Sequence, residues 1–117
     1  MTEQRALKFF RGEEGYNCAQ AVLKALEEVC PVDEAMIQQY ANAGGGRGEG
    51  GVCGALLAAK ALLADPAAIA RLEARFREEA GALTCRDIRK QRRVTCSQCV
   101  GAAARLLSEE LRRTAGG

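Results

Sequence analysis

Cysteine is the residue type in this sequence that is best suited to chemistry. The 117 residues contain six cysteines and no histidine. Without histidine, the chain has no Ser-His-Asp or Cys-His catalytic group and no mixed Cys/His zinc site. In a cytosolic chain, many cysteines indicate metal binding or redox chemistry more often than structural disulfides. The thiols are therefore the candidate functional groups.

Four cysteines share one local setting, because each is expected to begin a helix. The first turn of a helix has unpaired N–H groups and the positive end of the dipole, and both favour a thiolate over a thiol. The thiolate is the form of cysteine that binds metals and attacks disulfides. Three of the four follow a good N-cap type, namely Asn17, Thr84 or Thr95. The four cysteines are Cys18, Cys53, Cys85 and Cys96.

The other two cysteines have different settings. Cys30 precedes Pro31 at an expected helix end, where a cysteine is usually an inert core residue. Cys99 completes a CxxC motif with Cys96, and such a pair forms a dithiol or supplies two metal ligands. The alternative for Cys99 is that it simply faces the core.

Glycine and arginine residues beside these cysteines are candidate supporting groups. A glycine-rich stretch over residues 44–51 precedes Cys53, and the N–H groups of Gly45 and Gly46 could line a concavity for an anion or for cluster sulfides. Alternatively, glycine only permits a tight turn and close helix packing. Gly54 directly follows Cys53, and Arg86 adds positive charge beside Cys85. The stretch lacks the Gly-Lys-Ser/Thr of a phosphate-binding loop, so a nucleotide site is not expected.

The elements that position these residues are expected to be helices. Alanine and leucine are abundant while β-branched and aromatic residues are few, which predicts an all-α fold. We expect one domain over residues 1–117, a compact bundle of five or six helices with a glycine-rich loop. The first helix should bury Ala6, Leu7 and Phe10, and Gly81 should end the helix that Asp65 begins. The expected helices cover 3–11, 18–29, a segment after Asp33, 53–64, 66–79, a short turn or helix near Thr84, and a last helix from Thr95.

Charge and hydropathy restrict the setting of the chain. The N-terminus is charged and resembles no signal peptide, and the apolar stretch 52–64 falls short of a membrane span, so a cytoplasmic location is expected, without membrane insertion. The formal net charge of +2 gives no indication of nucleic-acid binding. The helix over 53–64 is nearly all apolar, interrupted by Lys60, which places it in the core or at a subunit contact, and the second case would give a homodimer.

Together, these motifs resemble the C-GCAxxG-C-C family of redox-active proteins, over roughly residues 7–106. The resemblance implies redox chemistry, and it implies that the four characteristic cysteines of the family are Cys18, Cys53, Cys85 and Cys96. The segments that carry it are Gly15-Tyr16-Asn17-Cys18-Ala19-Gln20-Ala21-Val22-Leu23, Cys53-Gly54-Ala55, Cys85-Arg86-Asp87-Ile88, and Cys96 with Val100.

Three kinds of thiol chemistry remain open. The leading hypothesis is an iron–sulfur or other metal centre on Cys18, Cys53, Cys85 and Cys96, used for electron transfer or sensing with an unidentified redox partner. The second is a cofactor-free thiol–disulfide protein that uses Cys96 with Cys99, or Cys53 with Cys85. The third is a structural zinc module with four cysteine ligands. Whether the chain is an oxidoreductase or an electron carrier stays open.

Overall fold

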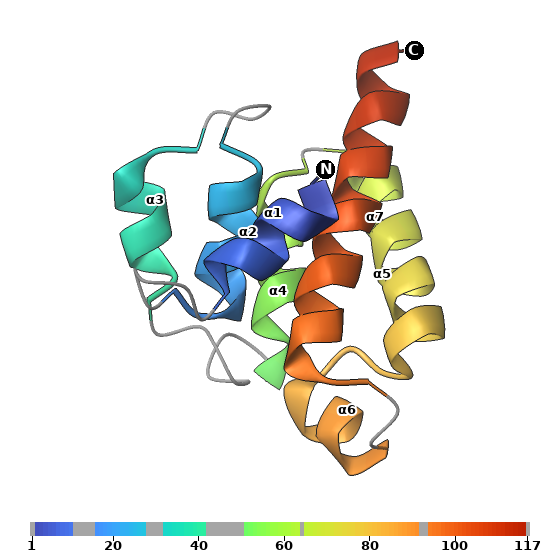
Figure 1. Ribbon diagram of the computed structural model, residues 1–117. Helices are drawn as coiled ribbons and strands as arrows, with labels where there is room; N and C mark the ends of the chain where they lie inside the picture. The colour runs from blue at the N-terminus through green and yellow to red at the C-terminus, as the bar shows by residue number, and fades with distance from the viewer. Residues whose placement is uncertain are drawn as a thin grey trace.

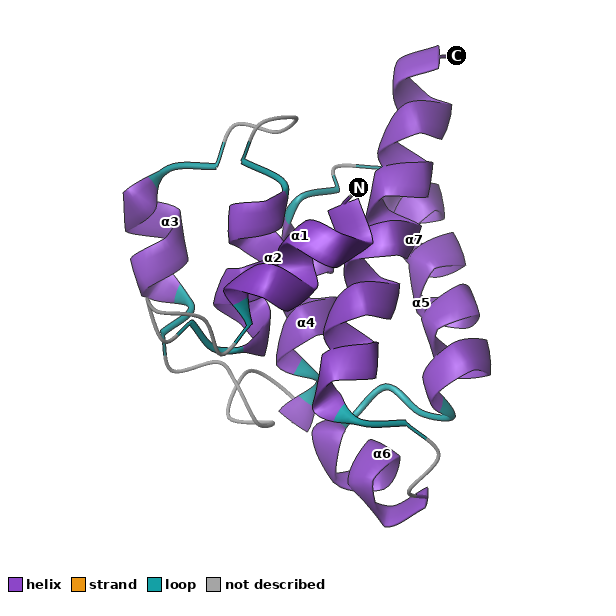
Figure 2. Cartoon of the chain, in the orientation of Figure 1, coloured by secondary structure: helices purple, strands orange, loops and turns teal. Residues whose placement is uncertain are grey.

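The computed structural model describes residues 2–10, 16–27, 32–41, 51–63, 65–91 and 94–116. These residues form seven α-helices, with isolated β-bridges as their only extended pairing (Figures 1 and 2). The all-α fold is as predicted, whereas the expected number of five or six helices is too low. The helices are α1 (Thr2–Phe9), α2 (Cys18–Ala25), α3 (Glu34–Gln39), α4 (Gly54–Ala61), α5 (Pro66–Ala80), α6 (Cys85–Gln91) and α7 (Cys96–Gly116).

Side-chain caps explain why even short segments are helical. Asn17 and Gln20 form a reciprocal capping box at the start of α2, as Thr95 and Gln98 do at the start of α7. Single side-chain oxygens cap three more helices, because each accepts a hydrogen bond from a first-turn N–H group. These caps are Asp33 for α3, Asp65 for α5 and Thr84 for α6. The segment expected as a short turn or helix near Thr84 is the helix α6, which brings the count to seven.

Helix α7 is the centre of the packing. It contacts α1, α2, α4 and α5, and α2 also packs on α4 (Figure 1). Buried small residues line these contacts and let helix backbones approach closely. Fully buried Leu72, Phe76 and Leu107 fill the wider spaces. The small residues are Gly54, Ala55, Ala58 and Ala59 in α4, and Ala102, Ala103 and Ala104 in α7.

The apolar helix α4 therefore has its buried residues covered within the chain by α2 and α7. The predicted homodimer stays a prediction. No helix in the described part of the chain has the length and apolar character needed to cross a bilayer.

Two further predictions concern Leu7 in α1 and Gly81 at the end of α5. The prediction that α1 buries Leu7 is wrong, because α1 turns Ala6 into the core and leaves Leu7 41% exposed. The helix that Asp65 begins does end at Gly81, which adopts a left-handed conformation with φ of 91°. Cys30, Gly45 and Gly46 lie outside the described residues, and so does the predicted glycine-rich loop except for Gly51.

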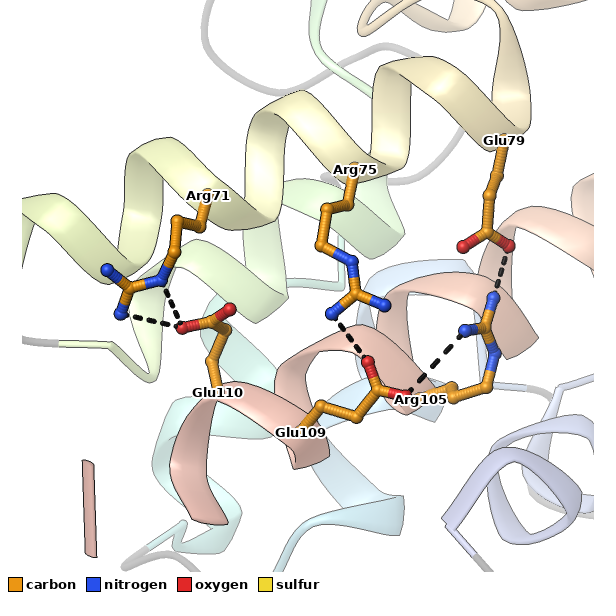
Figure 3. A network of polar contacts seen from close by, with 6 residues as sticks. All are labelled: Arg71, Arg75, Glu79, Arg105, Glu109 and Glu110. Carbon is orange, nitrogen blue, oxygen red and sulfur yellow. Dashed lines mark hydrogen bonds and ion pairs between the residues drawn. The ribbon is translucent and has the colours of Figure 1, made fainter. Parts of the chain in front are cut away.

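A row of ion pairs joins α5 to α7 (Figure 3). Increasing residue number on α5 pairs with decreasing number on α7, so the two helices run antiparallel. The row ends at Arg105, which pairs with Glu79 and also lies 3.9 Å from Glu109. Its other members are Arg71 with Glu110 at 2.9 Å and Arg75 with Glu109 at 2.6 Å.

The Arg71–Glu110 pair is expected to contribute most to stability. Glu110 is fully buried, so replacing Arg71 with methionine leaves a buried carboxylate without its guanidinium. Because Arg71 itself is partly exposed, we expect a loss of about 2–3 kcal/mol in the free energy of unfolding, less than for a fully buried pair. The matched control is Arg75→Met, whose partner Glu109 is partly exposed, with an expected loss below about 1 kcal/mol. Equal losses in urea unfolding of the two variants would contradict this assignment.

Candidate functional site

The first turns of several helices carry the cysteines, as the sequence predicts. Cys18, Cys85 and Cys96 are the first residues of α2, α6 and α7. Cys53 is the N-cap residue of α4. Cys18, Cys53, Cys85 and Cys99 are buried thiols, whereas the side chain of Cys96 lies outside what the structure describes.

An antiparallel bridge fixes the position of Cys53. Val52 pairs with Thr84, and the N–H group of Cys53 donates a hydrogen bond to the carbonyl of Leu83 at 2.9 Å. This bridge ties the entry into α4 to the entry into α6, and it thereby joins the backbone segments that carry Cys53 and Cys85. Arg86 directly follows Cys85, but its side chain is exposed on α6, whereas that of Cys85 is buried.

The capping box of α7 fixes the position of Cys99. The N–H group of Thr95 donates to the side-chain carbonyl of Gln98 at 2.7 Å, and the N–H group of Gln98 donates to the Thr95 hydroxyl at 3.2 Å. The next N–H group, that of Cys99, donates to the Thr95 carbonyl at 3.0 Å. Cys99 is therefore held in the first turn of α7, where its side chain is part of the buried core.

The structure brings the thiols of Cys53 and Cys99 together. A hydrogen bond from the Cys99 thiol is the largest of the effects that lower the pKa of Cys53 from 9.0 to about 7. Burial raises the pKa of Cys53, because it disfavours the charged form. The N–H groups of Leu56 and Ala55 lower the pKa again. Both N–H groups belong to the first turn of α4, where hydrogen bonding to the sulfur favours the thiolate.

The predicted metal ligands do not form a metal site among the described residues. Among the described residues, no three Cys, Asp or Glu side chains gather closely enough to hold a metal ion. The Cys53–Cys99 contact joins one of the four predicted ligands, Cys53, to a cysteine outside that set, Cys99. Gly54 is buried at the start of α4, where its lack of a side chain permits close packing of the backbone.

A surface pocket leads to Cys99. It has a volume of about 360 Å³ and lies between α1, the end of α5 and the first half of α7. Cys99 lines it while only 3% exposed, and Cys53 is 5% exposed and is not among the lining residues. The pocket lining consists of Leu7, Glu79, Ala80, Val94, Ser97, Gln98, Cys99, Gly101, Ala102 and Arg105.

Sequence reasoning missed the Cys53–Cys99 pairing. The CxxC motif drew attention to Cys96 as the natural partner of Cys99. The sequence does indicate that Cys99 is buried, because Cys99 shares the apolar face of its helix with Val100 and Ala103. That face predicts burial without indicating which other helix start it meets.

Comparison with known families identifies one match. The model of the family described as "Putative redox-active protein (C_GCAxxG_C_C)" matches residues 16–110. No curated protein and no solved structure matches the chain.

Proposed function

This chain belongs to the C_GCAxxG_C_C family of redox-active proteins, and from that premise we propose that it is a thiol–disulfide redox protein whose working pair is Cys53 and Cys99. The observation that carries the proposal is the hydrogen bond between these two buried thiols, together with the pKa of about 7 at Cys53. A pair of adjacent thiols with one thiolate near neutral pH is what two-electron disulfide exchange requires.

The two cysteines have separate roles. Cys99 lines the pocket and meets the substrate, whereas Cys53 lies behind it and resolves the mixed disulfide. When a mixed or internal disulfide is reduced, the thiol of lower pKa is the better leaving group. Cys53 fits that role, because its pKa is lowered to about 7.

A substrate disulfide, RSSR, oxidises the pair in two exchange steps. The Cys99 proton passes to Cys53, and the Cys99 thiolate attacks one substrate sulfur, so that the substrate S–S bond breaks and RS⁻ leaves. That RS⁻ takes up the proton from Cys53, which then attacks the Sγ atom of Cys99 and expels the second RS⁻. Two electrons pass from the cysteines to the substrate, and the products are the Cys53–Cys99 disulfide, RSH and RS⁻.

A direct test is to identify the disulfide that forms. The reduced protein is treated with one equivalent of a small disulfide, remaining thiols are alkylated, and linked peptides are identified by mass spectrometry. We expect Cys53 linked to Cys99 as the main product, and the Cys53→Ser variant should stop at a mixed disulfide on Cys99. A main product that links Cys96 to Cys99 would favour the CxxC motif instead and contradict this proposal.

A metal–sulfur centre is the second candidate, because the Val52–Thr84 bridge joins the segments that carry Cys53 and Cys85. Among the described side chains, no three Cys, Asp or Glu residues come close enough to hold a metal ion, whereas Cys53 and Cys99 share a hydrogen bond. Anaerobic purification followed by an absorption spectrum and by iron, zinc and sulfide analysis separates the two candidates. Stoichiometric metal lost in the Cys18→Ser and Cys85→Ser variants would favour the metal centre over the dithiol.

A further inference from the structure

The pocket at Cys99 has the size of a small-molecule site. Its volume of about 360 Å³ lies at the lower end of the range that ligand pockets occupy, roughly 300–1,000 Å³. Leu7, on its lining, is the one large apolar side chain that is exposed in the described part of the chain. A broad apolar surface for a protein substrate is therefore missing around it in that part, which favours a small thiol compound.

The charged residues of the pocket are one of each sign. Arg105 from α7 and Glu79 from α5 both line it, and their side chains point toward one another (Figure 3). Both are partly exposed, at 37% and 40%, so their mutual ion pair is weak and readily exchanged for ligand contacts. A ligand that carries a carboxylate and an ammonium group side by side would satisfy both residues at once.

The rest of the lining is small or apolar. Gly101 and Ala102 lie one turn or less beyond Cys99 on α7 and leave room beside it, while Leu7, Ala80 and Val94 add apolar contacts. The methylene and sulfur atoms of a short thiol compound suit such surroundings. The pocket thus offers a reactive cysteine, an apolar lining and one charge of each sign.

We propose that this pocket takes a small zwitterionic disulfide of the amino-acid type, such as cystine, as the oxidant of the Cys53–Cys99 pair. The α-carboxylate binds Arg105, the α-ammonium binds Glu79, and the disulfide lies against Cys99. This inference rests on the proposed function. Cystine takes the place of RSSR in the two exchange steps, and the products are the Cys53–Cys99 disulfide and two molecules of cysteine.

The test compares four disulfides that differ in charge: cystine, cystamine, and the disulfides of mercaptopropionate and mercaptoethanol. The rate of oxidation of the protein by each is divided by the rate of the same disulfide with dithiothreitol, which removes differences in intrinsic reactivity. We expect cystine to be favoured roughly tenfold over each of the other three, the effect of one or two charge-assisted contacts.

Two variants assign the contacts. Arg105→Gln should abolish the preference over cystamine, which lacks carboxylates, and Glu79→Gln should abolish the preference over the mercaptopropionate disulfide, which lacks ammonium groups. Arg75→Gln is the matched control, because Arg75 belongs to the same ion-pair row but does not line the pocket. It should keep the full preference for cystine. Circular dichroism confirms that each variant is folded.

A non-reactive ligand separates this inference from the proposed function. Lanthionine, the thioether counterpart of cystine, should bind the reduced protein in calorimetry and should bind Arg105→Gln roughly tenfold more weakly. If lanthionine binds but no Cys53–Cys99 disulfide forms, the pocket assignment stands and the proposed function fails. If the disulfide forms equally fast with all four oxidants and lanthionine does not bind, the pocket assignment is overturned.

Discussion

Replacing Cys99 with alanine is expected to raise the pKa of Cys53 from about 7 toward its ordinary value of 9.0. The Cys99 thiol is the largest cause of the lowered pKa, and burial then acts against the thiolate with less opposition. At pH 7 the thiolate fraction would fall from about one half to roughly one hundredth. Alkylation of Cys53 should therefore slow by up to roughly fifty-fold, as measured by peptide mass spectrometry across a pH series.

The Cys99→Ser variant is the matched control for this experiment. A serine hydroxyl still donates a hydrogen bond to the Cys53 thiolate, although it cannot form a disulfide. We expect the pKa of Cys53 to stay closer to 7 in this variant than in Cys99→Ala, while disulfide formation is lost in both. An unchanged pKa in Cys99→Ala would show that the N–H groups of Leu56 and Ala55 dominate, contrary to our account.

The second large effect is expected on stability. Oxidation to the Cys53–Cys99 disulfide closes a loop of about 45 residues, and the entropy that this removes from the unfolded chain corresponds to about 4 kcal/mol. Because the two thiols already meet in the reduced fold, the native state needs little rearrangement to form the bond. The free energy of unfolding of the oxidised protein in guanidinium chloride should exceed that of the reduced protein by about this amount.

This measurement also distinguishes the two possible dithiols. A Cys96–Cys99 disulfide closes a loop of only a few residues and stabilises by at most about 2 kcal/mol on the same scale. Cys53→Ser should abolish the gain on oxidation, whereas Cys30→Ser should leave it unchanged. Retention of the full gain in Cys53→Ser would rule out Cys53 as the partner of Cys99.

The helix starts could be predicted well because their causes are local. Asn17 with Gln20 and Thr95 with Gln98 are capping pairs within four consecutive residues, and both form as capping boxes. The helix ends were less predictable, since α2 ends at Ala25 and α4 at Ala61, both before the expected residues. The exposure of Leu7 was missed because it depends on how α1 lies across α7, which no local pattern contains.

The site could be predicted only in part for a similar reason. That cysteines at helix starts tend toward thiolates follows from the backbone of each helix alone. Which two of them meet depends on the packing of α4 against α7 and on the bridge between Val52 and Thr84. The interactions that bring Cys53 to Cys99 therefore span 46 positions of sequence, and no spacing rule such as CxxC describes them.

The shared hydrogen bond between the two thiols also determines how the protein couples protons to electrons. Below pH about 7, where Cys53 is protonated, reduction of the disulfide takes up two protons with two electrons. Above that pH Cys53 is a thiolate in the reduced pair, and reduction takes up one proton fewer. The midpoint potential should then fall by about 59 mV per pH unit below the break and by only about 30 mV above it. Neutral pH therefore lies at this break, so the pH dependence of the midpoint potential there is determined by the protonation of Cys53.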